Sequence, residues 1–167
     1  MGLFSKKEIL QSEPGVLYAI TSGNVIKIEQ VKDEVFAQKM MGDGLAFVSK
    51  DGEVVSPCDG IITAIFQTNH AIGITTDDGT EILIHIGIDT VKEGGNGFKG
   101  FVKNGERVTR GQKLIIFDKQ KLEAKGYDLT IPMIITNMDE INIKIIADGA
   151  VTKGTKVMQF KKITQEV

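Results

Sequence analysis

The stretch "TNHAIGITTDDGTEILIHIGIDTV" (residues 68–91) contains both histidines of the chain, His70 and His85, in two apolar segments on either side of an Asp-Gly pair. An Asp-Gly pair between β-forming residues is typical of a two-residue type I′ hairpin turn. The sequence therefore predicts a tight β-hairpin with Asp78 and Gly79 as its loop. The question it raises is whether the hairpin brings the two imidazoles together.

In the register set by that loop, Ile72 lies opposite His85 and Gly87 lies opposite His70. Directly opposed residues share a face of the sheet, so the histidines become diagonal neighbours with Cβ atoms at most ~7–8 Å apart. Gly87 would leave space above His70 for a ligand or a partner. A one-residue bulge would instead place the histidines on opposite faces. We expect Ile72, Ile74 and Leu83 on the histidine face and Ile82, Ile84 and Ile86 on the other.

Two neighbouring imidazoles have a defined chemistry. Burial and mutual repulsion both disfavour the imidazolium form, which keeps at least one ring neutral near pH 7. A neutral imidazole has a free nitrogen lone pair, so it can act as a nucleophile or as a metal ligand. The pattern alone is equally compatible with a pair of hydrogen-bonded core histidines that have no chemical role.

The rest of the chain indicates an all-β fold. Short segments rich in Ile and Val alternate with Gly or Asp-Gly turn signals, a pattern that favours an antiparallel sandwich or barrel over βαβ units. Helical signals are confined to residues 33–41 and to residues 118–126, where Gly126 is placed to end a short surface helix.

A weak internal repeat is also visible. "VTRGQKLIIF" (108–117) and "VTKGTKVMQF" (151–160) share a glycine turn followed by an apolar segment that ends in Phe. One explanation is a duplicated half-sandwich in which each copy needs the other to bury its apolar face. The alternative is that two unrelated turns use similar residues.

Composition bounds the function. The chain has 167 residues, 41% of them hydrophobic, and a net charge of −2, so we expect one globular domain that does not bind nucleic acid. Cys58 is the only cysteine, which excludes an intramolecular disulfide. The first ten residues lack the apolar core of a secretory signal, and no apolar run reaches ~18 residues. We expect a cytoplasmic protein.

The motifs together resemble a known family. "TNHAIGI", "ILIHIGIDTV", "VFAQKMMGDGLAF", "SPCDGIITAIF" and "NMDEI" are similar to the glucose-type IIA component of the bacterial phosphoenolpyruvate-dependent sugar phosphotransferase system (PTS). The resemblance implies an antiparallel β-sandwich built as a duplicated hybrid motif (a barrel-sandwich), with one or two short helices. It also implies one IIA domain over residues 15–167, preceded by a flexible tail over residues 1–14.

What the resemblance implies for the site is specific. His85 would accept a phosphoryl group at Nε2 from the phosphocarrier HPr and pass it to a cysteine of the IIB domain of a sugar permease. His70 would hydrogen-bond the phosphoryl group, and Thr68 would help to hold that network. Such a protein is a phosphotransferase component in sugar uptake and phosphorylation. It needs no cofactor, and it can have regulatory partners.

The resemblance also implies a docking surface. Asp33 and Asp89 would meet basic side chains of HPr, although a plain N-cap for Asp33 and an ordinary strand-end role for Asp89 are the alternatives. The family commonly has Phe at the positions of Ile72 and Ile86. The apolar rim would consist of Val35, Phe36, Met41, Phe66, Ile72 and Ile86.

Some of the same residues are compatible with other functions. His70, His85 and Asp89 could form the ligand set of a zinc-dependent hydrolase, although a catalytic zinc also needs an open position and an acid or base. A zinc ion that His70 and His85 share with a partner protein is compatible with the resemblance. "VKNGERVTRGQKLIIF" (residues 102–117) resembles half of a lipoyl- or biotinyl-type carrier domain, for which Lys119, just after this segment, would be the modified residue.

Cys58 and the first ten residues each have two possible roles. Cys58 is expected to be a buried thiol rather than a phosphocysteine, because no basic residue follows closely. The N-terminal ten residues place Leu3, Phe4, Ile9 and Leu10 around two lysines. They can form an amphipathic helix in weak contact with an anionic membrane or remain an ordinary disordered terminus.

Overall fold

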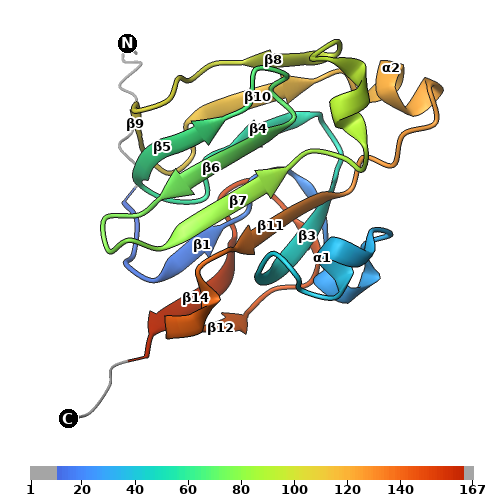
Figure 1. The fold of residues 1–167 in the computed structure, drawn as a ribbon. Helices are drawn as coiled ribbons and strands as arrows, with labels where there is room; N and C mark the ends of the chain where they lie inside the picture. The colour runs from blue at the N-terminus through green and yellow to red at the C-terminus, as the bar shows by residue number, and fades with distance from the viewer. Residues whose placement is uncertain (1–10, 164–167) are drawn as a thin grey trace, which may run out of the picture.

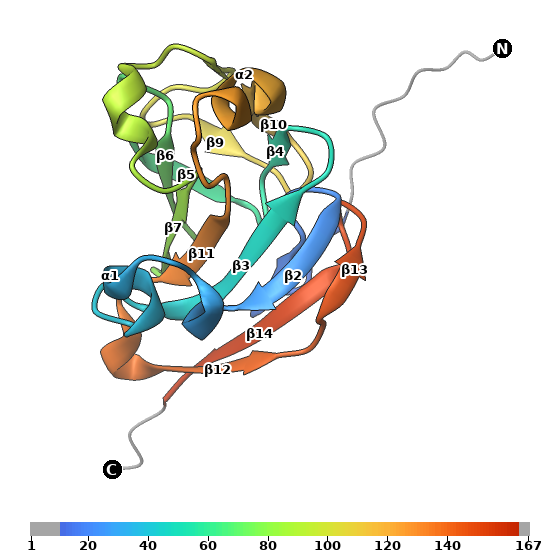
Figure 2. The ribbon, with the colours of Figure 1, turned by 90° about the vertical axis from the view of Figure 1, so that its right-hand side faces the viewer.

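The protein is a β-sandwich, described here from a computed structural model that covers residues 11–163. One large sheet forms one layer, and two small sheets pack against its inner face; Figures 1 and 2 show the layers from two directions. All strand pairs are antiparallel. The predicted all-β sandwich is confirmed.

The large sheet has eight strands in the order β13 (Gly149–Val151), β2 (Gly23–Lys27), β3 (Asp43–Ser49), β11 (Ile131–Ile135), β7 (Glu81–His85), β6 (Ala71–Thr75), β5 (Gly60–Ile65) and β9 (Arg107–Val108). The two three-stranded sheets are β1 (Val16–Tyr18), β14 (Lys156–Lys162) and β12 (Ile141–Ile145), and β4 (Glu53–Val55), β10 (Lys113–Phe117) and β8 (Phe98–Gly100). The helices are α1 (Glu34–Ala37) and α2 (Lys119–Ala124), with 3₁₀ turns η1 (Ile28–Gln30), η2 (Thr90–Glu93) and η3 (Met138–Glu140).

Both short helices were expected from the sequence, and their ends follow from local chemistry. Asp33 accepts a hydrogen bond from the Val35 N–H at the start of α1, and Asp118 accepts one from the Lys121 N–H at the start of α2. Gly126 follows α2 in a left-handed conformation, with φ +89°. None of the helices in the described part of the chain is both long and apolar enough to span a bilayer.

The central strands of the large sheet are buried on both faces. Their inner side chains, such as those of Ile84 and Met133, join the main core together with residues of both small sheets. On the outer face, η1 and α1 cover a second, smaller core that includes Phe36, Ala46 and Ile134, with Leu83 packed against it. This double burial explains why β7 and β11 read as nearly continuous apolar runs. This smaller core also lies beside His85, whose ring is next to that of Phe36.

The internal repeat is a structural duplication. The two copies form the central strands β10 and β14 of the two small sheets, and the order of the large sheet is symmetrical about the β11–β7 pair. Their turns make the same backbone bonds: Gly111 donates to the carbonyl of Ser56 (2.9 Å), and Gly154 donates to that of Ala19 (3.0 Å). Both closing phenylalanines, Phe117 and Phe160, point into the main core.

The hairpin between β6 and β7 differs from the prediction by one residue. Its loop has three residues: the Gly79 N–H donates to the carbonyl of Thr76 (2.9 Å), and the Thr76 N–H donates to the carbonyl of Thr80 (2.9 Å). The Asp78 carboxylate accepts bonds from the hydroxyl groups of Thr76 and Thr80 and from the Thr80 N–H. These bonds favour a type I turn closed by Gly79 at φ +88° over the predicted two-residue turn.

The extra loop residue reverses the two faces of β6 relative to those of β7. His85 lies opposite Ala71 instead of Ile72, and Leu83 lies opposite Gly73. The outer face therefore carries Leu83 and His85, as the prediction required for these two residues. Ile72 and Ile74 were expected beside the histidines but lie with Ile82, Ile84 and Ile86 in the main core.

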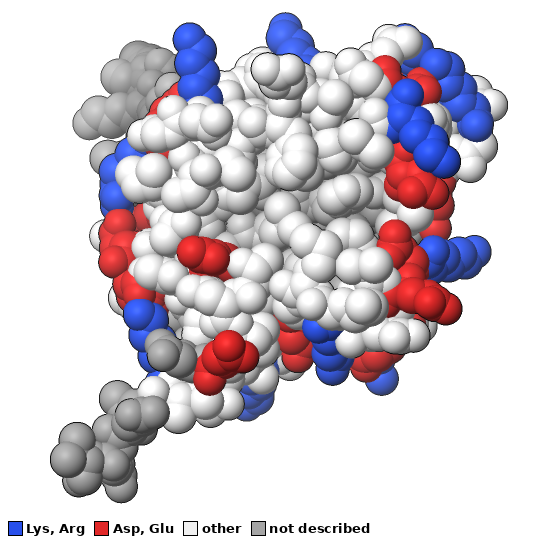
Figure 3. Space-filling view, in the orientation of Figure 1, with Lys and Arg blue, Asp and Glu red and all other residues white. Residues whose placement is uncertain are grey.

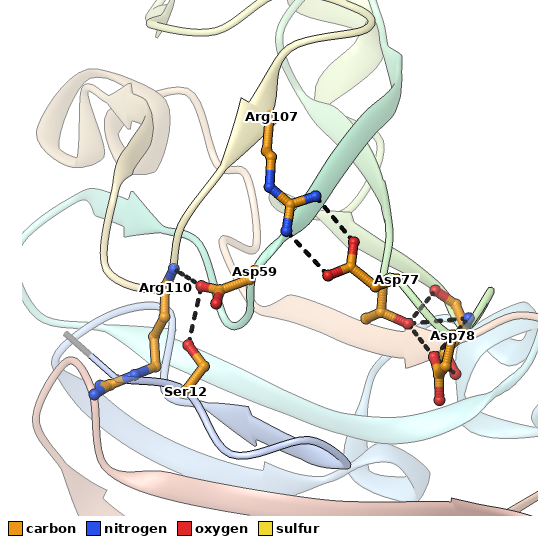
Figure 4. Close-up of polar contacts among 8 residues, drawn as sticks. Ser12, Asp59, Asp77, Asp78, Arg107 and Arg110 are labelled. Carbon is orange, nitrogen blue, oxygen red and sulfur yellow. Dashed lines mark hydrogen bonds and ion pairs between the residues drawn. The ribbon is translucent and has the colours of Figure 1, made fainter. Parts of the chain in front are cut away.

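The start of the described chain is bound to the sandwich. Ser12 donates to the Asp59 carboxylate (2.9 Å), which also accepts the Arg110 backbone N–H (2.8 Å), as Figure 4 shows. Nearby, Arg107 forms a forked pair with Asp77 at 2.9 and 3.0 Å (Figure 4). Residues 11–14 of the predicted tail are thus held in part, and residues 1–10, including the segment proposed to contact a membrane, lie outside the described residues.

Two turn glycines have different surroundings, which predicts a measurable difference in stability between their alanine variants. Gly52 has φ +73°, and a Cβ added there would lie 2.6 Å from the Phe117 carbonyl oxygen, whereas Gly105 has φ +85° and open space around it. We expect Gly105→Ala to lower the free energy of unfolding by about 1 kcal/mol through backbone strain alone. Gly52→Ala should cost about 1–3 kcal/mol more, because a backbone atom must move. Urea unfolding of both variants checks this; equal losses would contradict it.

Candidate functional site

His85 is the last residue of β7 and lies on the outer face, at the margin of the smaller core. Its ring centroid is 5.3 Å from that of Phe36, which α1 places against it. The N-cap bond of Asp33 fixes the start of this one-turn helix. The helix is therefore the element that builds an apolar wall on one side of His85.

His70 lies just before β6, where its carbonyl still accepts a hydrogen bond from the Ile86 N–H (2.7 Å). Strict alternation along β6 would point His70 to the inner face, as the corrected register requires. However, β6 begins only at Ala71, so His70 precedes the strand. Asn69, the residue before His70, has a left-handed conformation with φ +56°. The two imidazole centroids lie 5.1 Å apart, with their planes at 81°. The expected neighbouring imidazoles are present. They meet because the backbone turns at Asn69, and not because the two histidines share a strand face.

A backbone carbonyl fixes the tautomer of His85. Its Nδ1 lies 2.8 Å from the carbonyl oxygen of Gly87. A carbonyl can only accept, so Nδ1 donates and carries the proton. The neutral ring then has its lone pair on Nε2. Gly87 was predicted to leave open space above His70; instead the site around it is filled, since an added Cβ would lie 2.5 Å from the Thr90 methyl carbon.

Thr68 holds the second imidazole. Its hydroxyl oxygen is hydrogen-bonded to Nδ1 of His70. His70 is only 4% exposed, and its ring lies edge-on to that of Phe66 at a centroid distance of 5.2 Å. If the Thr68 hydroxyl donates, His70 carries its proton on Nε2. The pair would then offer one nitrogen acceptor on His85 and one N–H donor on His70.

Burial sets the charge state of both rings. It lowers the pKa of His85 below the ordinary value of 6.5, against the opposing effects of the Gly87 carbonyl and the carboxylates of Asp33 and Asp89. The pKa of His70 is also lowered, first by burial and then by repulsion from His85. Both imidazoles are therefore predominantly neutral at pH 7, whereas the sequence predicted this for at least one of them.

The apolar rim is partly as expected. Val35, Met41 and Phe66 are exposed hydrophobic side chains with 39%, 45% and 48% of their surface accessible. Phe36 is buried behind them against His85. The prediction that Ile72 and Ile86 belong to the rim is wrong, because both are fully buried in the main core. In the observed register Ile72 lies opposite Ile84 on the inner face of the sheet, and Ile86 faces the same side as Ile84.

Acidic groups border this apolar surface. The carboxylates of Asp33 and Asp89 both tend to raise the pKa of His85, against the larger effect of burial. Figure 3 shows a broad uncharged area over β6, β7 and β11, with acidic atoms gathered at its margin beside α1. Asp33 is an N-cap as well, so the two interpretations of this residue are compatible.

The other candidate chemistries are not favoured. Within residues 11–163, no three His, Cys, Asp or Glu side chains form a metal-binding group, so His70, His85 and Asp89 do not make the zinc site of a hydrolase. Cys58 is buried as expected, and burial, with the nearby carboxylates, raises the pKa of its thiol to about 12. Lys119 begins α2 and pairs with Glu123 at 2.7 Å, so it is not presented on a carrier hairpin.

Comparison with known proteins agrees with this arrangement. Residues 15–141 match the family described as phosphoenolpyruvate-dependent sugar phosphotransferase system, EIIA 1. The chain is 47% identical over 129 residues to the PTS system glucose-specific EIICBA component of Staphylococcus saprophyticus, covering 77% of this chain and 19% of that protein. It is 44% identical over 133 residues to the PTS system beta-glucoside-specific EIIBCA component of Bacillus subtilis, covering 80% and 22%. The chain thus spans about a fifth of the length of these relatives.

A solved structure supports the same assignment. The glucose permease IIA from Mycoplasma capricolum superposes with a TM-score of 0.83 at 37% identity, covering 87% of this chain and 94% of that one. Fold and site together define a β-sandwich with a paired-histidine centre of the glucose-type IIA class. The chain belongs to the EIIA 1 family of the PTS.

Sequence reasoning missed one member of the site. The Gly87 carbonyl is the group that orients His85, whereas Gly87 had been interpreted only as a gap. The spacing offers a signal: a glycine two residues after a strand-end histidine can turn the chain back so that its carbonyl meets Nδ1. The φ of +80° at Gly87 is the conformation that makes this turn.

The lowered histidine pKa values give a pH prediction. In imidazole NMR titrations, both midpoints should fall below about 6.5, the unfolded value. Because the unfolded chain then binds more protons, this contribution to stability is present above about pH 6.5 and is lost as the pH falls through the folded pKa values. Urea unfolding from pH 7.5 to 5 should show a shallower loss in His85→Gln. A His85 midpoint above 6.5 would mean that the carboxylates of Asp33 and Asp89 outweigh burial.

Proposed function

We propose that the chain is a IIA phosphocarrier that takes a phosphoryl group from phospho-HPr onto Nε2 of His85 and passes it to the cysteine of a sugar-permease IIB domain. The observation that supports this most is the bond from Nδ1 of His85 to the Gly87 carbonyl. It leaves the lone pair on Nε2, and phosphoryl transfer needs chiefly a positioned nucleophile and stabilised charge.

The first step can be written with all bonds accounted for. The Nε2 lone pair attacks the phosphorus atom, a new N–P bond forms, and the N–P bond of the donor phosphohistidine breaks, its electron pair returning to the donor ring. The product ring carries both the phosphoryl group and the Nδ1 proton, so it is cationic. This positive charge is stabilised by the Gly87 carbonyl and by the carboxylates of Asp33 and Asp89, which therefore favour the phosphorylated state.

His70 is suited to the phosphoryl group itself. With its proton on Nε2, held there by the Thr68 hydroxyl, it can donate a hydrogen bond to a phosphoryl oxygen. Because the ring is buried, this donor is fixed before the donor protein arrives, which lowers the reorganisation needed during transfer. In the second step, a IIB thiolate attacks the same phosphorus atom, and the electron pair of the breaking N–P bond returns to His85.

The surroundings fit two protein partners in turn. Val35, Met41 and Phe66 offer exposed apolar contact area around the site, and their burial by a partner would exclude water that hydrolyses the phosphoramidate. The acidic margin beside α1 would steer a basic partner such as HPr. The histidines would work on the cytoplasmic side of the membrane, where such a permease presents its IIB domain. In this proposal neither the sugar nor a cofactor enters the site, and a zinc ion shared with a partner stays a prediction.

Reconstitution tests the two histidine roles separately. With phosphoenolpyruvate, enzyme I and HPr, the wild-type chain should gain one acid-labile, alkali-stable phosphate. His85→Ala should gain none, because the nucleophile is missing. His70→Ala should still become labelled but should pass the group to a IIB domain about 10–100-fold more slowly, since one preorganised donor is lost.

The controls separate folding from chemistry. Both variants should retain cooperative urea unfolding, since neither side chain belongs to the main core. Labelling of His85→Ala would remove His85 from the proposed role. Transfer to IIB at the wild-type rate by His70→Ala would remove the role given to His70.

A further inference from the structure

The chain turns sharply after β7, and part of the backbone of this turn is in an unfavourable conformation. Residues 86–90 include two left-handed residues, Gly87 at φ +80° and Asp89 at φ +60°. A left-handed aspartate costs about 1 kcal/mol. The turn nevertheless has to be fixed closely, because the acceptor for His85 is the Gly87 carbonyl within it.

Two consecutive peptide groups in this turn are held at both ends. In the peptide between Ile86 and Gly87, the nitrogen donates to the Thr130 carbonyl at 3.0 Å, and the oxygen accepts the Thr90 hydroxyl. In the next peptide, the Ile88 nitrogen donates to the Asp128 carbonyl at 2.8 Å. The oxygen of that second peptide is the one that accepts His85 Nδ1.

Thr90 is the only side chain among these contacts apart from His85 itself, and it acts twice. Its hydroxyl group donates to the oxygen of the first peptide. Its methyl carbon packs so closely on Gly87 that a Cβ added to Gly87 would lie only 2.5 Å from it. Thr90 is fully buried, so it cannot touch a docked protein. A buried threonine whose hydroxyl group and methyl group both fix the same turn is suited to holding the acceptor of His85 in place.

We propose that Thr90 is a positioning residue that sets the tautomer and ring orientation of His85 through the Ile86–Gly87 and Gly87–Ile88 peptides, an inference that rests on the proposed role of His85. Without the Thr90 hydroxyl, the Ile86 carbonyl loses its partner in a buried setting, and the first peptide is held only by the bond from its nitrogen to Thr130, so that it can tilt. The Gly87 carbonyl then moves away from Nδ1. The imidazole exchanges between its two neutral tautomers, one of which blocks Nε2 with a proton.

The test compares Thr90→Val with Thr90→Ser in the full chain. Valine has nearly the shape of threonine but no hydroxyl group, whereas serine keeps the hydroxyl group and lacks the methyl group. The readout is the pair of imidazole nitrogen chemical shifts of His85 at pH 7.5, which distinguish a protonated nitrogen from a bare one. We expect a protonated Nδ1 and a bare Nε2 in the wild type and in Thr90→Ser, and averaged shifts in Thr90→Val.

Transfer kinetics give a second readout that a merely structural role would not produce. With phospho-HPr as donor, the rate constant for labelling Thr90→Val should fall about tenfold at unchanged KM, because the docking surface is intact and only the nucleophile is displaced. Thr90→Ser should recover most of that rate. If Thr90→Val does not fold, Thr90→Ala, which removes the hydroxyl group without adding apolar volume, replaces it.

The outcomes are distinct. Wild-type shifts in Thr90→Val, with only its free energy of unfolding lowered, would overturn the inference and leave Thr90 a structural residue. A wild-type chain with its proton on Nε2 of His85 would overturn it as well. The chemical-shift comparison needs no phosphoryl donor, so failure of the wild-type chain to accept a phosphoryl group would count against the proposed function and not against the role of Thr90.

Discussion

The hydrogen bond from Nδ1 of His85 to the carbonyl of Gly87 is the interaction on which the site depends. Burial keeps the ring neutral, but burial alone does not decide which nitrogen is bare. The carbonyl makes that choice, since it accepts from Nδ1 and leaves Nε2 with the lone pair. The same carbonyl also stabilises the positive charge that the ring would carry once phosphorylated. One backbone oxygen thus favours both the reactive state and its product.

The fold positions this bond by giving the two halves of a duplicated sandwich different outer faces. The main core holds both halves together, and its two small sheets are built alike around β10 and β14. On the outer face, β7 carries Leu83 and His85, whereas its counterpart β11 carries Pro132 and Ile134 in the corresponding region. Only one half therefore has the histidine pair. The other half contributes Ile134 to the small core, over which α1 presents Phe36 to His85.

The sequence predicts much of this because its signals are local. Apolar alternation and glycine turns give the sandwich, Asp118 and Gly126 give α2, and the repeated Val-Thr-basic-Gly pattern gives the two equivalent turns. The register of the hairpin was wrong because Asp-Gly is compatible with two loop lengths. The choice between them falls to the Asp78 carboxylate and its bonds to Thr76 and Thr80, which a pattern of apolar residues does not contain. That error placed Ile72 on the histidine face in the prediction, whereas it lies in the main core.

The proximity of His70 and His85 was predicted for a reason that the structure does not support. It depends on the left-handed residue Asn69 just before His70, and the tautomer of His85 depends on a backbone oxygen; neither is visible as a side-chain pattern. The central claim is that Nε2 of His85 is the nucleophile, and the most direct measurement is NMR of the phosphorylated, histidine-¹⁵N-labelled chain. A phosphorus–nitrogen coupling on Nε2 of His85, with the proton retained on Nδ1, is the result this account predicts. A phosphoryl group on Nδ1 of His85, on His70 or on Cys58 would contradict it.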